Sequence, residues 1–474
     1  MHGQDLFNRF IQRYPHAGRN IGQFRPHLSR RQFFQLAGAG VTGSYLLNRA
    51  DAATTTLWQA NVTTLNKAKN VIFILMAGAP SHIDTFDLKV TASTPMATVK
   101  PDTINGVAWP TGTLPKLGDA FKNKDVAVVR SLRAWAVAHN LAQTWTQIGR
   151  NPAAALGDIS PNIGTVVALE KTPERLPSHV FPTFLALNSD GGAGPGYFDS
   201  QYAPFKTNAA ATGLPNTTNV DGEPRFNSKF DLMHSIDDTL RMNSPYGRPL
   251  ENMDDFYRAA KGLMYNPTVD QAFKFTPADS ARYGTTSFGN ACLVAKQALA
   301  AGQGTRYVQI TVGGWDMHTN IYGVNGNPAT GTNIFTLGKQ LDDGVSALIA
   351  DLKATGLFDS TLVVMAGEFG RTTGAITSQA GRDHYPQQFA VFAGAGVQGG
   401  RAIGSTDAQG NATVDPGWSR QRDVKPEDIE ATIYSALGIN WTTIRYDDPF
   451  GRGFEYVPHA KDDIYGPINE LWGK

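Results

Sequence analysis

The stretch Thr361–Pro386 reads TLVVMAGEFGRTTGAITSQAGRDHYP, and the interpretation of the whole chain starts from it. Its first residues form a short apolar run, which predicts a buried strand. Gly367 allows the chain to turn, so Glu368 falls at the carboxyl end of that strand. Ligands of open α/β sheets bind beyond the carboxyl ends of the strands. A polar loop then leads to a second group of polar residues at 382–384, before the apolar run Phe389–Phe392.

The polar side chains of this stretch allow two interpretations. Glu368, Arg371, Arg382, Asp383 and His384 could form a functional site, or they could form a salt-bridged surface loop. The functional interpretation is favoured because three other predicted strands also end in acidic residues, histidines or arginines.

The composition is that of an ordinary globular protein. The chain has 474 residues, of which 41% are hydrophobic, and its net charge is +1. Residues 1–52 hold seven arginines and two acids, which leaves 35 basic and 39 acidic residues in the remainder. No basic stripe predicts a nucleic-acid partner. Cys292 is the single cysteine, so we expect no intrachain disulfide, no disulfide-linked partner and no thiolate metal cluster.

The N-terminal residues 1–52 resemble a twin-arginine export signal. Residues 29–34 read SRRQFF, a mild apolar run follows at 36–47, and Ala-Asp-Ala at 50–52 resembles a cleavage site. The alternative is an arginine pair in front of an amphipathic helix. The signal predicts export by the twin-arginine translocase to the periplasm or cell surface. That route carries folded proteins, which suits a chain without disulfides.

Apolar runs alternate with helical patterns from about Lys67 to Asn440. Strands are predicted at 70–76, 126–129, 184–187, 307–312, 362–365 and 389–392, and helices at 288–301, 334–352 and 426–437. This alternation predicts an α/β fold with one mostly parallel sheet and helices on both faces. We expect an α/β domain at 65–440, a polar surface insertion at 205–255, and a C-terminal tail at 441–474 packed on the domain.

Several titratable residues follow the predicted strands. Asp84 comes after the first strand, His139 after the second, and Asp316 and His318 after the strand at 307–312. Asp316 and His318 are two residues apart, so an extended chain would point both to one side. The pair predicts part of a metal site, the alternative being an Asp that orients a core histidine. His139 could equally be a surface histidine in a loop.

Seven motifs follow one another along the chain: MAGAPSHIDTFD, HN…IGR, ARYG…FG, GGWDMHTN, GEFGRT, GRDHYP and VKPEDIEATIYSALGI. Their order resembles that of an uncharacterised family of twin-arginine-exported bacterial proteins, considered distant members of the sulfatase and alkaline-phosphatase superfamily. The resemblance covers nearly all of the chain after residue 52. It implies an alkaline-phosphatase/sulfatase-like α/β fold.

The superfamily resemblance also implies roles for individual residues. Asp316, His318 and His384 resemble one metal half-site, with Glu368 and Asp383 assisting. The donors are nitrogen and oxygen, which suits one divalent metal ion, zinc or manganese.

Other positions depart from the superfamily pattern. Ala77 and Gly78 stand where the first strand normally supplies metal-binding Asp residues, so Asp84 is expected to substitute for them. His139 falls where the nucleophile would be, and the resemblance implies a nucleophile or a general acid/base there. Arg371 and Arg382 are expected to clamp an anionic group, because guanidinium groups bind such groups bidentately.

These observations predict an exported, metal-dependent hydrolase of phosphate or sulfate esters. Its substrate would be an anionic small molecule or glycan. The alternative is a catalytically degenerate sulfatase-like protein that acts as a periplasmic or cell-surface binding protein. A single fold supports many functions, so fold class does not decide between the two.

Overall fold

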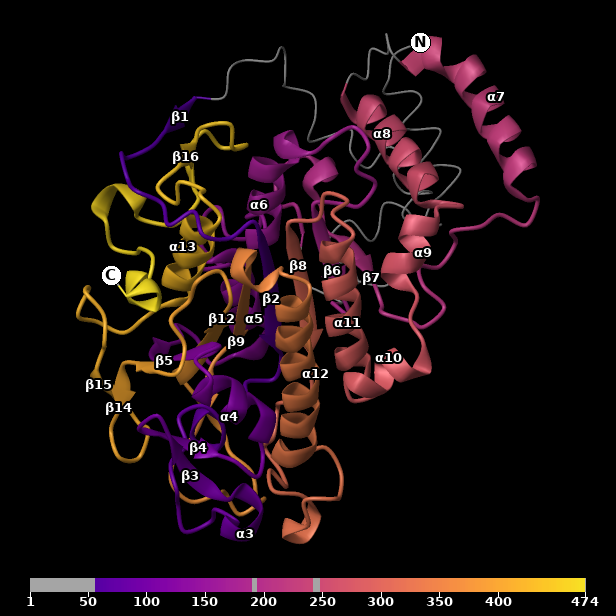
Figure 1. Ribbon diagram of the computed structural model, residues 1–474. Coiled ribbons are helices and arrows are strands. Elements are labelled where there is room, and N and C mark those ends of the chain that lie inside the picture. The colour runs from indigo at the N-terminus through magenta and orange to yellow at the C-terminus, as the bar shows by residue number, and fades with distance from the viewer. Residues whose placement is uncertain (1–55, 190–193, 242–247, 474) are drawn as a thin grey trace, which may run out of the picture. The chain divides into compact units, whose positions relative to one another are not determined.

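An eight-stranded sheet lies at the centre of the described part of the chain (Figure 1). The structure is a computed structural model that describes residues 56–189, 194–241 and 248–473. The strand order is β13-β5-β12-β9-β2-β8-β6-β7. The strands are β2 (Asn70–Met76), β5 (Val126–Arg133), β6 (Phe184–Leu187), β7 (Phe205–Thr207), β8 (Tyr307–Val312), β9 (Thr361–Gly367), β12 (Gln387–Ala393) and β13 (Ala402–Ile403).

One strand of this sheet runs against the others. β12 pairs antiparallel with both β5 and β9, whereas the other neighbouring strands pair in parallel. The start of β12 therefore lies at the same edge as the carboxyl ends of β5, β9, β2 and β8. This arrangement brings the residues before β12 to the edge where ligands of α/β sheets bind.

The central strand β2 is buried along its whole length and contributes to two cores. Ile72, Ile74 and Met76 belong to one hydrophobic cluster, and the alternate residues Val71, Phe73 and Leu75 belong to the other. Successive strand residues point to opposite faces, so each face of the sheet needs its own covering layer. The expected α/β fold with helices on both faces is confirmed.

Helices supply both covering layers. The α-helices of the described residues are α3 (Met96–Val99), α4 (Pro115–Lys122), α5 (His139–Ile148), α6 (Ile163–Lys171), α7 (Glu223–Arg241), α8 (Arg248–Leu263), α9 (Pro267–Phe273), α10 (Pro277–Arg282), α11 (Ser287–Ala300), α12 (Ile334–Ala354) and α13 (Pro426–Ala436). Residues of α4, α11 and α12 belong to the cluster on one face, and residues of α6 and α13 to the cluster on the other. Figure 1 shows α11 and α12 side by side in front of the sheet.

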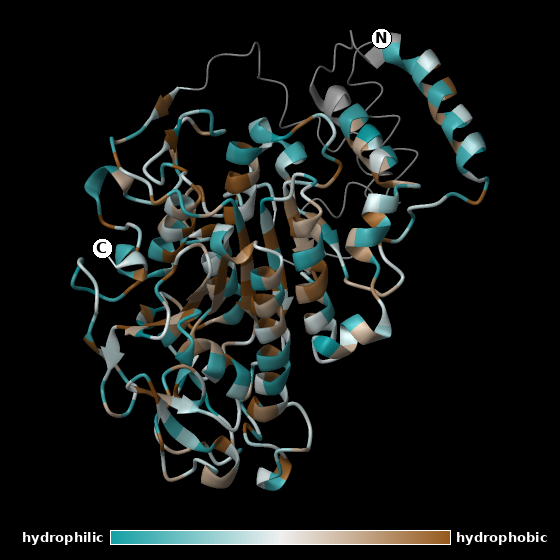
Figure 2. Cartoon of the chain, in the orientation of Figure 1, coloured by the Kyte–Doolittle hydropathy of each residue, from teal (hydrophilic) through white to brown (hydrophobic). Residues whose placement is uncertain are grey.

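The long helix α12 follows from its local sequence. The side chain of Asn333 caps it by accepting hydrogen bonds from the backbone N–H groups of Phe335 and Thr336. Its apolar residues keep helical spacing, and those facing the sheet are buried. Figure 2 shows this pattern as alternating hydrophobic and hydrophilic bands, while the central strands are almost uniformly hydrophobic.

The short strands form small sheets outside the central one. They are β1 (Leu57–Trp58) with β16 (Ile444–Arg445) and β17 (Phe454–Glu455), β3 (Pro101–Ile104) with β4 (Val107–Pro110), β10 (Gly370–Arg371) with β11 (His384–Tyr385), and β14 (Ser405–Thr406) with β15 (Thr413–Asp415). The β10–β11 pair matters most for the site, because it folds residues 372–383 back on themselves.

The structure adds detail to two predicted segments. Residues 205–255, expected to be a polar surface insertion, begin with β7, which is an edge strand of the central sheet. They continue into α7 and α8. Residues 441–474, expected to be a packed tail, place Phe454, Leu471 and Trp472 in the core cluster that also contains α13. The predicted export signal at 1–52 lies outside the described residues.

Helix length and hydropathy bear on membrane association. Within the described ranges, no helix combines the length and the apolar character that crossing a bilayer requires.

Candidate metal centre

Three histidines and one aspartate meet at the edge of the sheet where β5, β8 and β9 end. His139 is the first residue of α5, which follows β5. Asp316 and His318 lie in the loop after β8, and His384 lies in β11, just before β12. Each of the four offers a ligand atom, and these atoms all lie within 4.8 Å of one another. We call these residues the His3Asp cluster.

The distances show how closely the donor atoms approach. His318 Nε2 lies 2.9 Å from His384 Nε2. The Oδ1 atom of Asp316 lies 3.1 Å from His318 Nε2, 3.3 Å from His139 Nε2 and 3.9 Å from His384 Nε2. The Nε2 atom of every histidine in the cluster is therefore directed toward the same small volume.

Each histidine is oriented through its other ring nitrogen. His139 Nδ1 lies 2.8 Å from Glu368 Oε1, and His318 Nδ1 lies 2.9 Å from Asp383 Oδ1. His384 Nδ1 lies 2.6 Å from the backbone oxygen of Val137. Carboxylate and carbonyl oxygens only accept hydrogen bonds, so each Nδ1 carries the hydrogen. In a neutral imidazole, each Nε2 then presents its lone pair to the cluster.

Glu368 is a buried carboxylate that organises several groups at once. Its Oε1 accepts hydrogen bonds from the backbone N–H of Gly78 at 2.9 Å, from Gln143 Nε2 at 3.0 Å and from His139. Its Oε2 is buried and has no hydrogen-bond partner. Gln143 lies one helical turn after His139 on α5, so the two side chains share a helix face. This spacing is a sequence signal for Gln143 that the motif analysis missed.

Arg371 contacts two residues of the cluster, Asp316 and His318. Its side chain is fully buried, and its guanidinium donates to the backbone oxygens of Gly78 and Ala79. It also donates to Asp316 Oδ1 at 2.6 Å, and its Nη1 lies 3.3 Å from His318 Nε2. Arg371 therefore holds Asp316 and the loop after β2 in place, and all of its side-chain nitrogens are engaged.

The surroundings of the cluster raise the pKa of one histidine and lower the pKa of another. The hydrogen bond that His139 donates to Glu368 raises the pKa of His139 above its usual value, although burial opposes the shift. Burial lowers the pKa of His384, and the nearby Arg371 adds to that effect. Burial favours the neutral form of Asp316, but the hydrogen bond and charge of Arg371 prevail and lower its pKa. The carboxylate of Asp316 is thus anionic, as a metal ligand must be.

Two residues predicted for the site lie elsewhere. Asp84 Oδ2 pairs with Arg382 Nε at 2.7 Å, and Tyr322 donates its hydroxyl to Asp84 Oδ1 at 2.5 Å. Asp84 and Arg382 are both buried, and Arg382 also donates to the backbone oxygens of Thr372 and Gly374. This pair joins the loop after β2 to the loop before β11. It occupies both side chains, whereas the sequence suggested a metal ligand and an anion clamp.

The other predicted residues take different positions in one site. His139 was expected to be a nucleophile or acid/base, and its Nε2 lies beside the donors of Asp316, His318 and His384. Glu368 and Asp383 were expected to assist metal binding, and each bonds to a histidine rather than pointing its own donor into the cluster. Phe369 packs against the rings of His139 and His384, with centroids 4.9 and 4.6 Å away.

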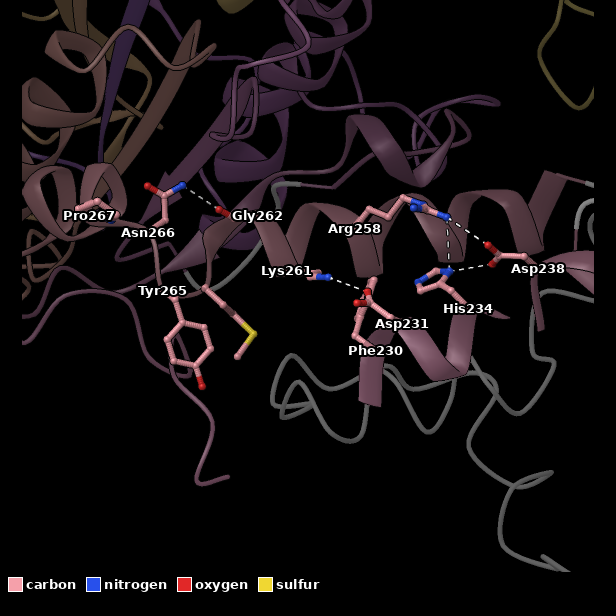
Figure 3. Close-up of a pocket in the computed structure, with 11 residues that line it drawn as sticks. Phe230, Asp231, His234, Asp238, Arg258, Lys261, Gly262, Tyr265, Asn266 and Pro267 are labelled. Atoms are coloured by element: carbon pink, nitrogen blue, oxygen red, sulfur yellow. Dashed lines mark hydrogen bonds and ion pairs between the residues drawn. The ribbon is translucent and has the colours of Figure 1, made fainter. Parts of the chain in front are cut away.

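A second histidine–carboxylate group connects α7 to α8 beside a cavity of about 600 Å³ (Figure 3). His234 Nδ1 lies 2.7 Å from Asp238 Oδ1 and 3.3 Å from Asp254 Oδ1. Arg258 already pairs with both carboxylates, at 2.7 Å to Asp254 and 3.6 Å to Asp238. Arg258 contacts Oδ2 of each carboxylate and His234 contacts Oδ1, so the two side chains share both acids and the group acts as a link between the two helices.

Comparison with known proteins places the chain in context. No curated protein matches the sequence significantly. Among solved structures, the lipoteichoic acid synthase LtaP of Listeria monocytogenes matches with 13% identity and a TM-score of 0.37, over 85% of this chain and 79% of that one. A sulfatase of a Pseudoalteromonas species matches with 13% identity and a TM-score of 0.38, over 78% and 68% of the two chains.

A third solved structure is described as a protein of the alkaline phosphatase superfamily from Vibrio parahaemolyticus. It matches with 11% identity and a TM-score of 0.34, over 90% of this chain and 78% of that one. The family model named DUF1501, a protein of unknown function, matches residues 68–462, which include every residue of the His3Asp cluster. The chain therefore belongs to the DUF1501 family.

Proposed function

We propose that the protein is a metal-dependent hydrolase of phosphate or sulfate esters, in which the His3Asp cluster holds one divalent ion. The observation that carries this proposal is the convergence of three imidazole Nε2 atoms on one carboxylate oxygen. Nitrogen and oxygen donors without sulfur suit zinc or manganese. The proposal extends the sequence-based expectation by adding His139 to the ligands.

The donor atoms fit a metal ion in their chemistry. The facing Nε2 atoms of His318 and His384 lie 2.9 Å apart, and the Nδ1 hydrogen bonds direct a lone pair from each toward the other. Two facing lone pairs repel unless a cation or a proton lies between them. The Nε2 atom of His139 is buried and has no hydrogen-bond partner. A cation shared by these atoms would satisfy all three.

The spacing of the donors also suits a metal ion. Ligands of a tetrahedral zinc at about 2.0–2.1 Å are separated by about 3.3 Å. The distances from Asp316 Oδ1 to His318 and His139, 3.1 and 3.3 Å, lie close to that value. The outer hydrogen bonds of the three histidines are the arrangement that typically fixes the ring orientation of metal-ligating histidines.

The proposed ligands would leave one coordination position of the ion open to a substrate. Catalytic zinc sites keep three protein ligands and an open position. The three histidines would supply three ligands, and Asp316, whose side chain is 47% exposed and shares its Oδ1 with Arg371, would be the weaker fourth donor beside the open position. When bound, the ion would act as a Lewis acid that stabilises negative charge on an ester oxygen.

The surrounding residues would position the ligands. Glu368 holds His139 in orientation, and Asp383 does the same for His318. Arg371 keeps Asp316 ionised and adds positive charge beneath the cluster, which favours an anionic substrate. Its burial makes it a positioning residue rather than a direct clamp on substrate.

Metal content is the first test of this proposal. Protein purified without chelator or histidine tag should contain about one zinc or manganese per chain, held by the His3Asp cluster. His384→Ala should lose the metal. His459→Ala removes a half-exposed histidine of the C-terminal segment and should keep it. If His384→Ala retained its metal as fully as His459→Ala does, the assignment of the metal to the cluster would be contradicted.

Activity is the second test. The metal-loaded protein should hydrolyse 4-nitrophenyl phosphate or 4-nitrophenyl sulfate, and His139→Ala and His384→Ala should abolish turnover. Full activity in both variants would overturn the proposal. Absence of metal and of turnover in the wild type, even after incubation with excess divalent ions, would favour the binding-protein alternative.

We also propose that this activity is exerted outside the cytoplasm, on an anionic small molecule or glycan. The support is the arginine pair Arg30-Arg31 with the apolar run that follows it, within residues 1–52. Replacing both arginines with lysine should retain a folded reporter fusion in the cytoplasm. Export of the reporter by the double variant would refute use of the twin-arginine route.

A further inference from the structure

An exposed apolar edge lies directly beside the His3Asp cluster. It is formed by the segment between β5 and α5, residues 134–138, which leads into His139. The side chains of Trp135 and Val137 are 48% and 41% exposed, although both are large and apolar. The backbone oxygen of Val137 lies 2.6 Å from His384 Nδ1, so this segment touches the cluster at two points. We call Trp135 and Val137 the apolar rim.

The structure holds the indole of Trp135 rigidly. Trp135 Nε1 donates to Glu427 Oε2 at 3.0 Å, and Trp145 Nε1 donates to Oε1 of the same carboxylate at 2.9 Å. Glu427 lies on α13 and is only 3% exposed. The two indole rings lie nearly parallel, 24° apart, with centroids 6.2 Å from each other. One buried carboxylate thus fixes two tryptophans, one of which remains nearly half exposed.

The surroundings of Trp135 restrict what it can recognise. The only hydrogen-bond donor of the indole, Nε1, is bonded to Glu427. A ligand can therefore contact ring carbons of Trp135 but cannot bind a free polar group on it. The ammonium of Lys425 lies 4.0 Å from the ring centroid, which adds positive charge next to the apolar surface. A fixed, exposed aromatic side chain beside charged groups is typical of a binding surface rather than of a core.

We infer that Trp135 is a specificity-determining residue, and that it contacts the organic group of an anionic ester whose phosphate or sulfate lies at the cluster. The inference rests on the proposed function and adds the substrate class. The alcohol part of the ester carries a ring with an apolar face, and small hydrophilic esters are poor ligands. The apolar rim is where this ring packs, because Val137 lies two residues before His139 and its backbone oxygen contacts His384 Nδ1.

Binding of two phosphonates that differ only in their organic group tests this inference without turnover. Calorimetry with zinc-loaded protein would compare phenylphosphonate with methylphosphonate. The wild type should bind phenylphosphonate about tenfold more tightly, because an aromatic contact of this kind contributes about one factor of ten. Trp135→Ala should abolish that preference without changing the affinity for methylphosphonate.

Control variants separate ring contact from misfolding. Trp135→Phe keeps a ring and should retain most of the preference. Val137→Ala keeps the backbone oxygen and should reduce the preference only partly. Phe450→Ala removes another exposed aromatic side chain, 59% exposed and in the C-terminal segment, and should leave the preference unchanged. Circular dichroism would verify that each variant is folded.

The possible outcomes are distinct. An unchanged ratio of affinities in Trp135→Ala, with both phosphonates still bound, would overturn this inference and leave the proposed function standing. Binding of neither phosphonate by the zinc-loaded wild type would overturn the proposed function, and this inference with it. A preference for phenylphosphonate that disappears in Trp135→Ala alone would support both.

Discussion

Glu368 illustrates how much depends on one buried carboxylate. It accepts three hydrogen bonds through Oε1, including the one that orients His139. Removal of such an outer partner typically weakens metal binding roughly 10–100-fold. We therefore expect Glu368→Gln to lower zinc affinity by that factor, measured by competition with a chromophoric chelator.

A matched control for this prediction is Asp383→Asn. Asp383 makes the equivalent hydrogen bond to His318, but its side chain is 63% exposed. Water can replace a partner at an exposed position, so we expect a smaller loss of affinity. Equal zinc affinity in Glu368→Gln and wild type would show that the carboxylate does not position the ligand.

Glu430 on α13 offers a test of burial that is independent of the His3Asp cluster. It is fully buried, and burial raises its pKa from 4.5 to about 8, although the charge of Arg150 opposes the shift. The folded protein thus holds a proton that the unfolded chain releases above pH 4.5. This contribution to stability is complete below pH 4.5 and is lost as pH rises to about 8.

The corresponding prediction uses Glu430→Gln, which cannot ionise. Between pH 5 and 8.5 the wild type should lose roughly 4 kcal/mol of unfolding free energy relative to the variant, at about 1.4 kcal/mol per pH unit. Guanidinium unfolding of both proteins at the two pH values measures this difference. Parallel stability curves for the two proteins would contradict the assignment of a neutral Glu430.

At the scale of elements, α12 contributes stability through one buried face. Leu348 on this helix has no exposed surface and belongs to the hydrophobic cluster on one face of the sheet. Leu348→Ala should lower the unfolding free energy by about 2–5 kcal/mol, because it removes buried methyl groups and leaves a cavity. Leu232→Ala on α7, where the leucine is 60% exposed, should change it by less than about 0.5 kcal/mol.

The loop before β11 is fitted closely against the loop that carries His318. A Cβ atom on Gly381 would lie 2.1 Å from the carbonyl carbon and oxygen of His318, which is impossible without movement. Gly381→Ala should therefore displace His318 and lower both stability and zinc affinity. Gly313→Ala, in the loop after β8, meets no atom within 4 Å and is the matched control. The same zinc affinity in both variants would contradict a role for the close packing.

At the scale of the whole molecule, a bound ion should stabilise the fold. The ligands come from α5, the loop after β8 and β11, so unfolding destroys the site. Zinc at 100 times its dissociation constant should raise the unfolding free energy by about 2.7 kcal/mol. Thermal unfolding with and without zinc measures this effect, which His318→Ala should abolish. An equal zinc effect in His318→Ala would place the ion elsewhere.

The predicted strands and helices show how far local patterns extend. The apolar runs at 70–76, 307–312 and 362–365 are buried strands in the structure. They could be predicted because a strand that is buried on one or both faces needs apolar residues on those faces. The segment 205–255 was expected to be only a polar insertion, yet it contains β7. Three residues of an edge strand, only partly buried, carry too weak a pattern to be recognised.

The sequence by itself determined the α/β class, the strands of the sheet centre, and the placement of acids and histidines after those strands. Only the tertiary structure decided their roles. His139 and Glu368 are 229 residues apart, and His318 and Asp383 are 65 apart. Whether a carboxylate binds a metal or orients a histidine depends on hydrogen bonds between such distant residues. Asp84 and Arg382 became a separate buried pair for the same reason, since periodicity records burial but not partners.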